Sequence, residues 1–147
     1  MSVVIRVVDS ADEVDDSFVA AFTALIPQLS ESSPPPTAAV LAEIVACPDS
    51  DLFVAELDGR IVGSLTLATY RLPTGLKAWI EDVVVDASAR GHGAGEALNQ
   101  AALESAKRRG AKHVSLTSRP SREAANRLYQ RIGFQPYSTN LYRFTLD

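Results

Sequence analysis

The chain has 147 residues, of which 46% are hydrophobic and 22% charged, and this size and composition predict a single globular domain, residues 1–147. Cys47 is the only cysteine, which excludes an internal disulfide, and His92 and His113 give no zinc-ligand spacing. Neither a run of 18 apolar residues nor a signal-peptide pattern occurs, so we expect a soluble, cytoplasmic protein with no membrane partner.

The net charge of −4 conceals an uneven distribution of charge along the chain. Residues 1–89 carry a balance of −10, whereas residues 90–147 carry a balance of +6. An acidic protein is a poor general binder of nucleic acid, so no nucleic-acid partner is expected. The basic half could receive a polyanionic small molecule such as a nucleotide cofactor, although solvated charges without a partner explain it equally well.

Hydrophobic periodicity and turn residues predict the elements of the first half. An apolar strand opens the chain, and apolar residues recur every three to four positions over residues 12–29, which predicts a helix. The serine- and proline-rich segment 30–36 ends it, and Thr37 caps a second helix that runs through Ala46. A meander follows, with strands at 52–57, 61–70 and 76–86, the first two joined by the hairpin signal Asp58-Gly59.

The second half mixes helices and strands. In chain order we predict a helix from Gly93 to Arg109 ended by Gly110, a strand at 113–117, a helix at 121–132 closed by Gly133, and strands at 134–138 and 141–146. The whole order predicts the α+β class, with a mixed, mostly antiparallel sheet of about seven strands and about four helices.

A glycine-rich turn connects the strand that ends near Val85 to the helix that begins at Gly93. Free N–H groups at a helix start form an anion site, and glycine lets a phosphate approach the backbone closely. The dinucleotide-binding fingerprint does not fit this turn, because its sixth position is Glu96. The P-loop pattern does not fit either, because no Gly-Lys-Ser/Thr sequence is present.

Another pattern does fit. Arg90, Gly93 and Gly95 resemble the coenzyme A signature of the GNAT superfamily of N-acetyltransferases: Arg or Gln, two residues, Gly, one residue, then Gly or Ala. The strand at 79–85 and the segment 122–134 are similar to the neighbouring motifs of that family, in the same order. The resemblance implies the GNAT fold over nearly the whole chain, acetyl-coenzyme A as cofactor without a metal, and transfer of an acetyl group to an amine.

The resemblance also implies positions for the cofactor. The main chain of Val83 and Val85 would pair with the pantetheine arm, and Arg119 or Arg122 could meet the ribose phosphate, although a solvated basic face explains those arginines as well. The cofactor-binding residues that it implies are Val83, Val84, Val85, Arg90, Gly91, His92, Gly93, Ala94, Gly95, Glu96 and Asn126.

Acetyl transfer needs a proton donor for the leaving thiolate, an oxyanion stabiliser and a base. The resemblance implies Tyr129 as the donor, with core packing as the alternative, and the amide of Val84 or Val85 as the oxyanion stabiliser at a strand bulge. Glu81 is the candidate base, with Asp82 or water as alternatives and a structural carboxylate as the non-catalytic explanation. Strand alternation predicts that Glu81 shares a side with Val83 and Val85, and that Asp82 lies on the other.

The variable parts of the chain should form the acceptor pocket: the first two helices, residues 34–36, Tyr70, Arg71 and Trp79. We expect a small-molecule primary amine. A protein amino terminus is less favoured, because the strand at 113–117 lacks the glutamate that ribosomal-protein acetyltransferases tend to carry there. A non-catalytic acyl-coenzyme A sensor is the rival from another class, but the presence of both Tyr129 and Glu81 argues against it. A homodimer is compatible with the sequence.

Overall fold

The computed structural model describes residues 2–147, which divide into two compact units. The first unit ends at Thr117 and the second comprises Ser118–Asp147. Each unit is described by itself below. None of the helices within residues 2–147 is long and apolar enough to cross a membrane.

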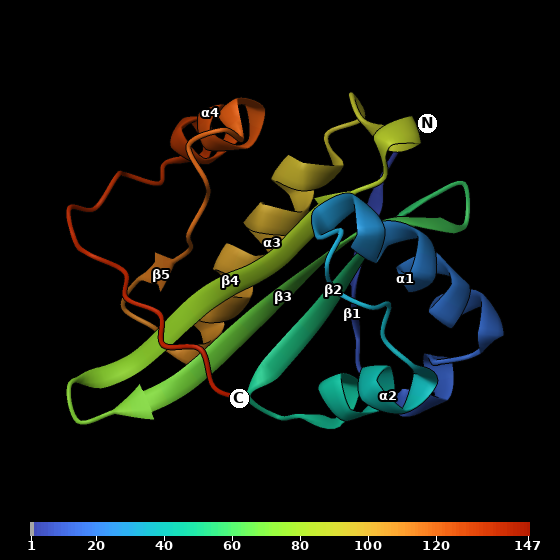
Figure 1. The fold of residues 1–147 in the computed structure, drawn as a ribbon, viewed down its shortest axis with the longest axis horizontal. Coiled ribbons are helices and arrows are strands. Elements are labelled where there is room, and N and C mark those ends of the chain that lie inside the picture. Colours follow the sequence, from blue (N-terminus) through green and yellow to red (C-terminus); the bar gives the residue numbers. More distant parts are fainter. Residues whose placement is uncertain (1) are drawn as a thin grey trace. The chain divides into compact units, whose positions relative to one another are not determined.

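The first unit is built on one sheet whose strands lie in the order β1-β2-β3-β4-β5 (Figure 1). The first four strands pair antiparallel, whereas β5 pairs parallel with β4. The strands are β1 (Val4–Val8), β2 (Ser50–Leu57), β3 (Arg60–Leu72), β4 (Gly75–Val85) and β5 (Val114–Ser115). The predicted α+β class with a mixed, mostly antiparallel sheet is therefore confirmed, with five strands rather than seven.

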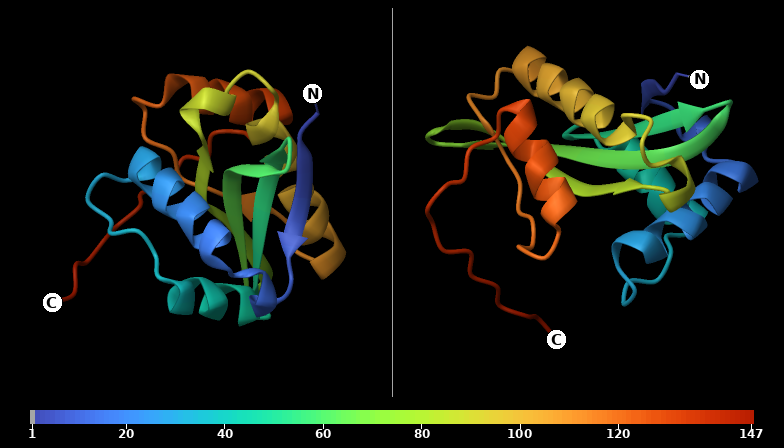
Figure 2. Two further views of the ribbon diagram at one scale, coloured as in Figure 1. Left: turned by 90° about the vertical axis from the view of Figure 1, so that its right-hand side faces the viewer. Right: turned by 90° about the horizontal axis from the view of Figure 1, so that it is seen from above.

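Helices cover both faces of this sheet (Figure 2). Helices α1 (Asp16–Leu29) and α2 (Ala38–Ala46) pack on one face, which we call the helix-pair face. Helix α3 (Ala94–Arg109) packs on the other, which we call the α3 face. Two short 3-10 helices, η1 (Ala11–Glu13) and η2 (Ala87–Ala89), complete the unit.

Local chemistry explains the boundaries of these elements. The Thr37 hydroxyl accepts a hydrogen bond from the Val40 amide at 3.2 Å, which confirms the predicted cap of α2. Asp58 and Gly59 have φ values of 53° and 76°, as a two-residue hairpin turn requires. Gly110 ends α3 with a φ of 89°. The sequence therefore correctly predicted the residues that form this cap, this hairpin turn and this helix end.

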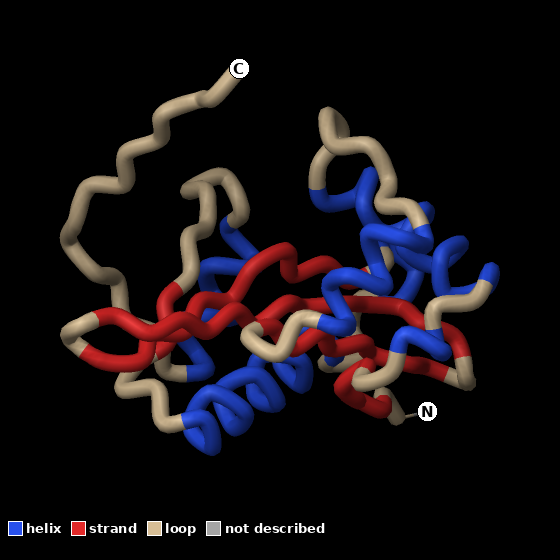
Figure 3. The backbone as a smooth tube through the Cα atoms, turned by 90° about the horizontal axis from the view of Figure 1, so that it is seen from below, coloured by secondary structure: helices blue, strands red, loops and turns tan. Residues whose placement is uncertain are grey.

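The second unit contains one helix, α4 (Glu123–Ile132), and the strands predicted after it are wrong. Figure 3 draws the chain from residue 134 onward as loop. An apolar alternation becomes a strand only where a neighbouring strand supplies hydrogen-bond partners, and no described segment pairs with this one. Its large apolar side chains are 67–89% exposed: Tyr137, Leu141, Tyr142, Phe144 and Leu146.

At Gly63 the strand β3 lies very close to β4 and α3. A Cβ atom built at this position would lie 3.0 Å from the Val84 carbonyl oxygen and 3.3 Å from the Leu98 Cδ1 atom of α3. The first neighbour is backbone and cannot rotate away, so a methyl group would force β4 or α3 to move. Glycine at this position therefore allows α3 to pack closely on the sheet.

We expect Gly63→Ala to lower the free energy of unfolding by about 1–3 kcal/mol, because it overpacks a filled core. Urea denaturation measures the loss, and the NMR shift of the Leu98 methyl groups reports the displaced contact. Gly59→Ala is the comparison, because a Cβ there meets nothing within 4 Å. It should leave the Leu98 signals in place. An unchanged Leu98 signal in Gly63→Ala would contradict the prediction.

Candidate functional site

Strand β4 contains a bulge near its C-terminal end. Val84 pairs with Ser64, and Glu81 pairs with Thr66. Two residues of β4 therefore lie between these pairs, whereas β3 has only one, so β4 contains one extra residue. The extra residue lies where Asp82 adopts a left-handed conformation with a φ of 51°. Such a bulge re-aims the side chains on either side of it and leaves one residue out of the regular ladder.

The bulge reverses the side-chain alternation of β4. Glu81 and Trp79 pair with Thr66 and Ala68, which belong to the helix-pair face. Val85, in contrast, pairs with Gly63, where an added Cβ atom would point toward Leu98 of α3. The prediction that Glu81 shares a side with Val85 is therefore wrong, because strict alternation does not hold across an inserted residue.

One edge of β4 is open beyond Trp79. Strand β5 pairs with β4 only at Ala78 and Trp79, so residues 80–85 have no strand partner on that side within the described chain. The Asp86 amide donates to the Val62 carbonyl at 2.7 Å and so points toward β3. Because backbone groups alternate along a strand, the amide of Val84 also points toward β3 and that of Val85 points to the open edge.

The glycine turn presents backbone amides at the start of α3. Gly91 and Gly93 have φ values of 89° and 77°, and a Cβ at either meets no atom within 4 Å. Glycine is needed there for its conformation and not to avoid a clash. Gly93 precedes the first residue of α3 and makes no side-chain cap hydrogen bond, so the amides of Ala94 and Gly95 are available to an anion. Arg90 and His92 flank them as exposed side chains.

Gln28 ties the end of α1 to the entrance of the glycine turn. Its Nε2 atom donates to Asp86 Oδ1 at 3.3 Å, and its Oε1 atom accepts from the Ala87 amide at 2.9 Å. Burial alone would raise the pKa of Asp86, but hydrogen bonds from Ser88 and Gln28 and the charge of Arg60 lower it. The sequence held no local signal for Gln28, because its partners lie almost 60 positions away.

Glu81 is an accessible carboxylate without a partner. It makes neither a hydrogen bond nor an ion pair with any residue that the structure describes. Partial burial raises the pKa of Glu81, and the neighbouring charge of Asp82 raises it further. A carboxylate with a raised pKa and free oxygens is suited to accept a proton.

The second unit holds the remaining predicted residues. The Asn126 Nδ2 atom donates to the Arg119 carbonyl at 3.0 Å. Tyr129 is buried and packs edge-on against Phe134, with ring centroids 5.8 Å apart. Its hydroxyl has no hydrogen-bond partner among residues 2–147, and burial raises its pKa although the charge of Arg122 lowers it in part. The hydroxyl therefore stays protonated at neutral pH and is free to donate.

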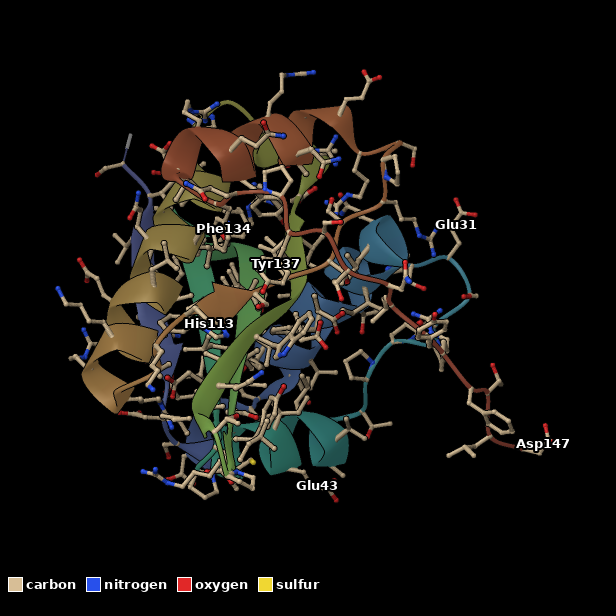
Figure 4. All side chains as sticks on the ribbon, turned by 90° about the vertical axis from the view of Figure 1, so that its left-hand side faces the viewer. Glu31, Glu43, His113, Phe134, Tyr137 and Asp147 are labelled. Atoms are coloured by element: carbon tan, nitrogen blue, oxygen red, sulfur yellow. The ribbon has the colours of Figure 1, made fainter. Side chains whose placement is uncertain are left out.

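The acidic side chains near the helix-pair face include Glu31, on the loop after α1, and Glu43, on α2. Both are exposed and point outward (Figure 4). Among the described residues, no cluster of three or more His, Cys, Asp or Glu side chains could hold a metal ion.

A surface hollow of about 570 Å³ lies elsewhere in the first unit, between α1 and the ends of the strands. Most of its charged side chains already pair with one another: Arg6 with Glu13 and with Glu56, and Arg60 with Asp86 at 3.7 Å. Asp15 accepts hydrogen bonds from the Ser17 hydroxyl and the Phe18 amide. The hollow therefore offers a ligand few free polar groups. The open edge of β4, the glycine turn and Glu81 form the candidate site of this unit.

Comparison with known proteins agrees with this geometry. The family model described as the acetyltransferase (GNAT) family matches residues 13–134. N-alpha-acetyltransferase 30 of Schizosaccharomyces pombe is 33% identical over 96 residues, which are 65% of this chain and 63% of that protein. The match therefore spans less than two thirds of the length of that relative.

Solved structures show the same fold. A protein of Agrobacterium tumefaciens strain C58 that is classed as an acetyltransferase has a TM-score of 0.82 at 26% identity, covering 97% of this chain and 99% of that one. An acetyltransferase of Trypanosoma brucei has a TM-score of 0.77 at 29% identity, covering 99% of this chain and 100% of that one. The chain belongs to the GNAT acetyltransferase family, as its glycine turn predicted.

Proposed function

We propose that the protein transfers the acetyl group of acetyl-coenzyme A to the primary amine of a small molecule. The observation that carries this proposal is the glycine turn at the start of α3, directly after a strand whose edge β5 leaves open. Helix amides suit a pyrophosphate, and an open strand edge suits the peptide-like amides of the pantetheine arm. When bound, acetyl-coenzyme A supplies an acetyl group activated as a thioester.

The main chain at the open edge and at the glycine turn would hold this substrate. The backbone groups of Val83 and the carbonyl of Val85 would pair with the pantetheine arm, and the amides of residues 91–96 would hold the pyrophosphate, with Arg90 beside them. The amide of Val85, rather than that of Val84, would stabilise the oxyanion, because it points to the open edge. Asn126 would add a contact to the cofactor arm.

Glu81 and Tyr129 would move the protons. The amine nitrogen attacks the thioester carbon, the carbon–sulfur bond breaks, and the amine loses one proton to Glu81 while the leaving thiolate takes one from Tyr129. The raised pKa of each group supports these roles, because it strengthens Glu81 as a base and keeps Tyr129 protonated. The family match supports the use of residues from both units, because the matched residues 13–134 include Glu81 and Tyr129.

A second acceptor class is the amino-terminal amine of a protein. The observation that favours it is the 33% identity to N-alpha-acetyltransferase 30. The segment 113–117, which contains β5 and lacks a glutamate, favours the small molecule. Release of free thiol from acetyl-coenzyme A, measured with a panel of small amines and of short peptides, decides between the two classes.

The cofactor assignment predicts that acetyl-coenzyme A raises the melting temperature in the presence of EDTA, because its site exists only in the native state. Gly93→Asp should abolish the rise, since a carboxylate there repels the pyrophosphate. Gly93→Asn is the matched control, because both side chains cap a helix and both residues tolerate positive φ. Thermal shift assays should show a larger loss for the charged variant. No rise in the wild type at millimolar ligand rejects the assignment.

The base assignment predicts that Glu81→Gln lowers turnover by roughly 10²-fold or more without weakening cofactor binding. In the wild type, kcat/KM should fall as the pH drops through the pKa of Glu81, which lies above the ordinary value of 4.5. Glu81→Gln should lose this acidic limb. Asp82→Asn is the control and should keep the acidic limb. The limb should shift to lower pH, because the charge of Asp82 no longer raises the pKa of Glu81. Equal small losses in both variants would assign the proton transfer to water.

The acid assignment predicts that Tyr129→Phe loses about 10- to 10³-fold in turnover while acetyl-coenzyme A still binds. The free energy of unfolding should change little, because the hydroxyl has no partner whose hydrogen bond would be lost. Stopped-flow turnover and urea denaturation of this one variant test both statements. Normal turnover removes Tyr129 from the mechanism, and if the wild type also releases no thiol with any amine, the sensor becomes the better interpretation.

A further inference from the structure

Two aromatic side chains lie next to each other on the helix-pair face. Trp79 precedes Glu81 by two positions on β4, and Tyr70, which pairs with Lys77, is the diagonal neighbour of Trp79 on β3. The indole Nε1–H of Trp79 donates a hydrogen bond to the Tyr70 hydroxyl at 2.9 Å. Because this bond joins two strands, it restricts the orientation of the indole. It also occupies the polar group of each ring, so the apolar ring faces are left for a ligand.

On the helix-pair face, side chains of β3 become more exposed to solvent toward Tyr70. Along β3, Ser64 is buried, Thr66 and Ala68 are half-buried, and Tyr70 is 41% exposed. On the α3 face, by contrast, the alternate residues of β3 from Gly63 through Thr69 are all buried. The cover provided by α1 and α2 therefore ends before the strands do. We call the accessible surface that remains the aromatic shelf, formed by Thr66, Ala68, Tyr70, Lys77, Trp79 and Glu81.

Opposite charges lie at the two ends of the shelf. Glu81 and Lys77 lie on the same face of β4, about 13 Å apart at the rise of an extended strand, with Trp79 midway. Neither charge has an ion-pair partner among residues 2–147. An ammonium group is attracted by Glu81 and repelled by Lys77, so an amine on the shelf has its nitrogen at the Glu81 end.

We propose that the aromatic shelf binds the acceptor and that this acceptor is a small primary amine carrying an aromatic ring. This inference rests on the proposed function. The nitrogen of the acceptor lies at Glu81 and its ring lies on Trp79. These two residues are about 7 Å apart along β4, which an arylalkylamine can span. The small side chains of Thr66 and Ala68 leave room for the ring, and aromatic contacts favour it over a short alkyl chain.

Acetylation of 2-phenylethylamine and of n-propylamine tests the proposal. The wild type should prefer the aromatic amine by about ten-fold in kcat/KM, and Trp79→Leu should remove the preference while leaving the KM for acetyl-coenzyme A unchanged. Tyr70→Phe, which keeps the ring and removes only the hydroxyl, should reduce the preference by a smaller factor. Val4→Ala, at a position 56% exposed on the opposite edge strand, should leave it unchanged. A preference that survives in Trp79→Leu overturns the proposal.

Fluorescence separates this proposal from the proposed function. Trp79 is the only tryptophan in the chain, so its emission reports binding on the shelf without turnover. Titration with 2-phenylethylamine should give a saturable change that n-propylamine does not give. Saturation without acetylation of any amine would reject the proposed function and support the shelf. Acetylation of amines without a saturable change or an aromatic preference would overturn the shelf alone.

Discussion

The bulge in β4 decides what the first unit presents to a ligand. Because one residue is inserted between Glu81 and Val84, the side-chain alternation reverses along the strand. The carboxylate of Glu81 therefore stays on the helix-pair face, while the amide of Val85 turns to the open edge. A left-handed conformation is unfavourable for Asp82, and the pairing of β3 with β4 on both sides of the bulge maintains it.

Because of the bulge, ligands can reach the same part of β4 from two directions. An extended ligand arm can reach the main chain of β4 from the open edge, whereas an amine can reach Glu81 from the helix-pair face. These two surfaces belong to the same few residues of β4, so atoms held at the edge and atoms held on the face meet at the bulge. A transferase needs this arrangement, because it must bring two substrates together while each keeps its own contacts.

Contacts between elements hold both surfaces in place. Gly63 allows α3, the helix that follows the glycine turn, to pack closely on the sheet. Gln28 links α1 to Asp86 and Ala87, where the turn begins. The loop that follows α1 starts two residues after Gln28 and borders the helix-pair face. The same short segment of chain therefore connects the glycine turn with the helix-pair face.

The local signals of the sequence were enough to place the glycine turn, the cap at Thr37, the hairpin at Asp58-Gly59 and most helices, because each depends on residues close together in the chain. The family resemblance implied a bulge in this strand, but the reversal of side-chain alternation across it, the role of Gln28 and the hydrogen bond between Trp79 and Tyr70 depend on strand register and long-range packing, which local patterns do not contain. The two strands predicted after α4 were wrong for the same reason. Alternating apolar residues specify a strand only when a partner edge is present, and tertiary structure alone decides whether one is.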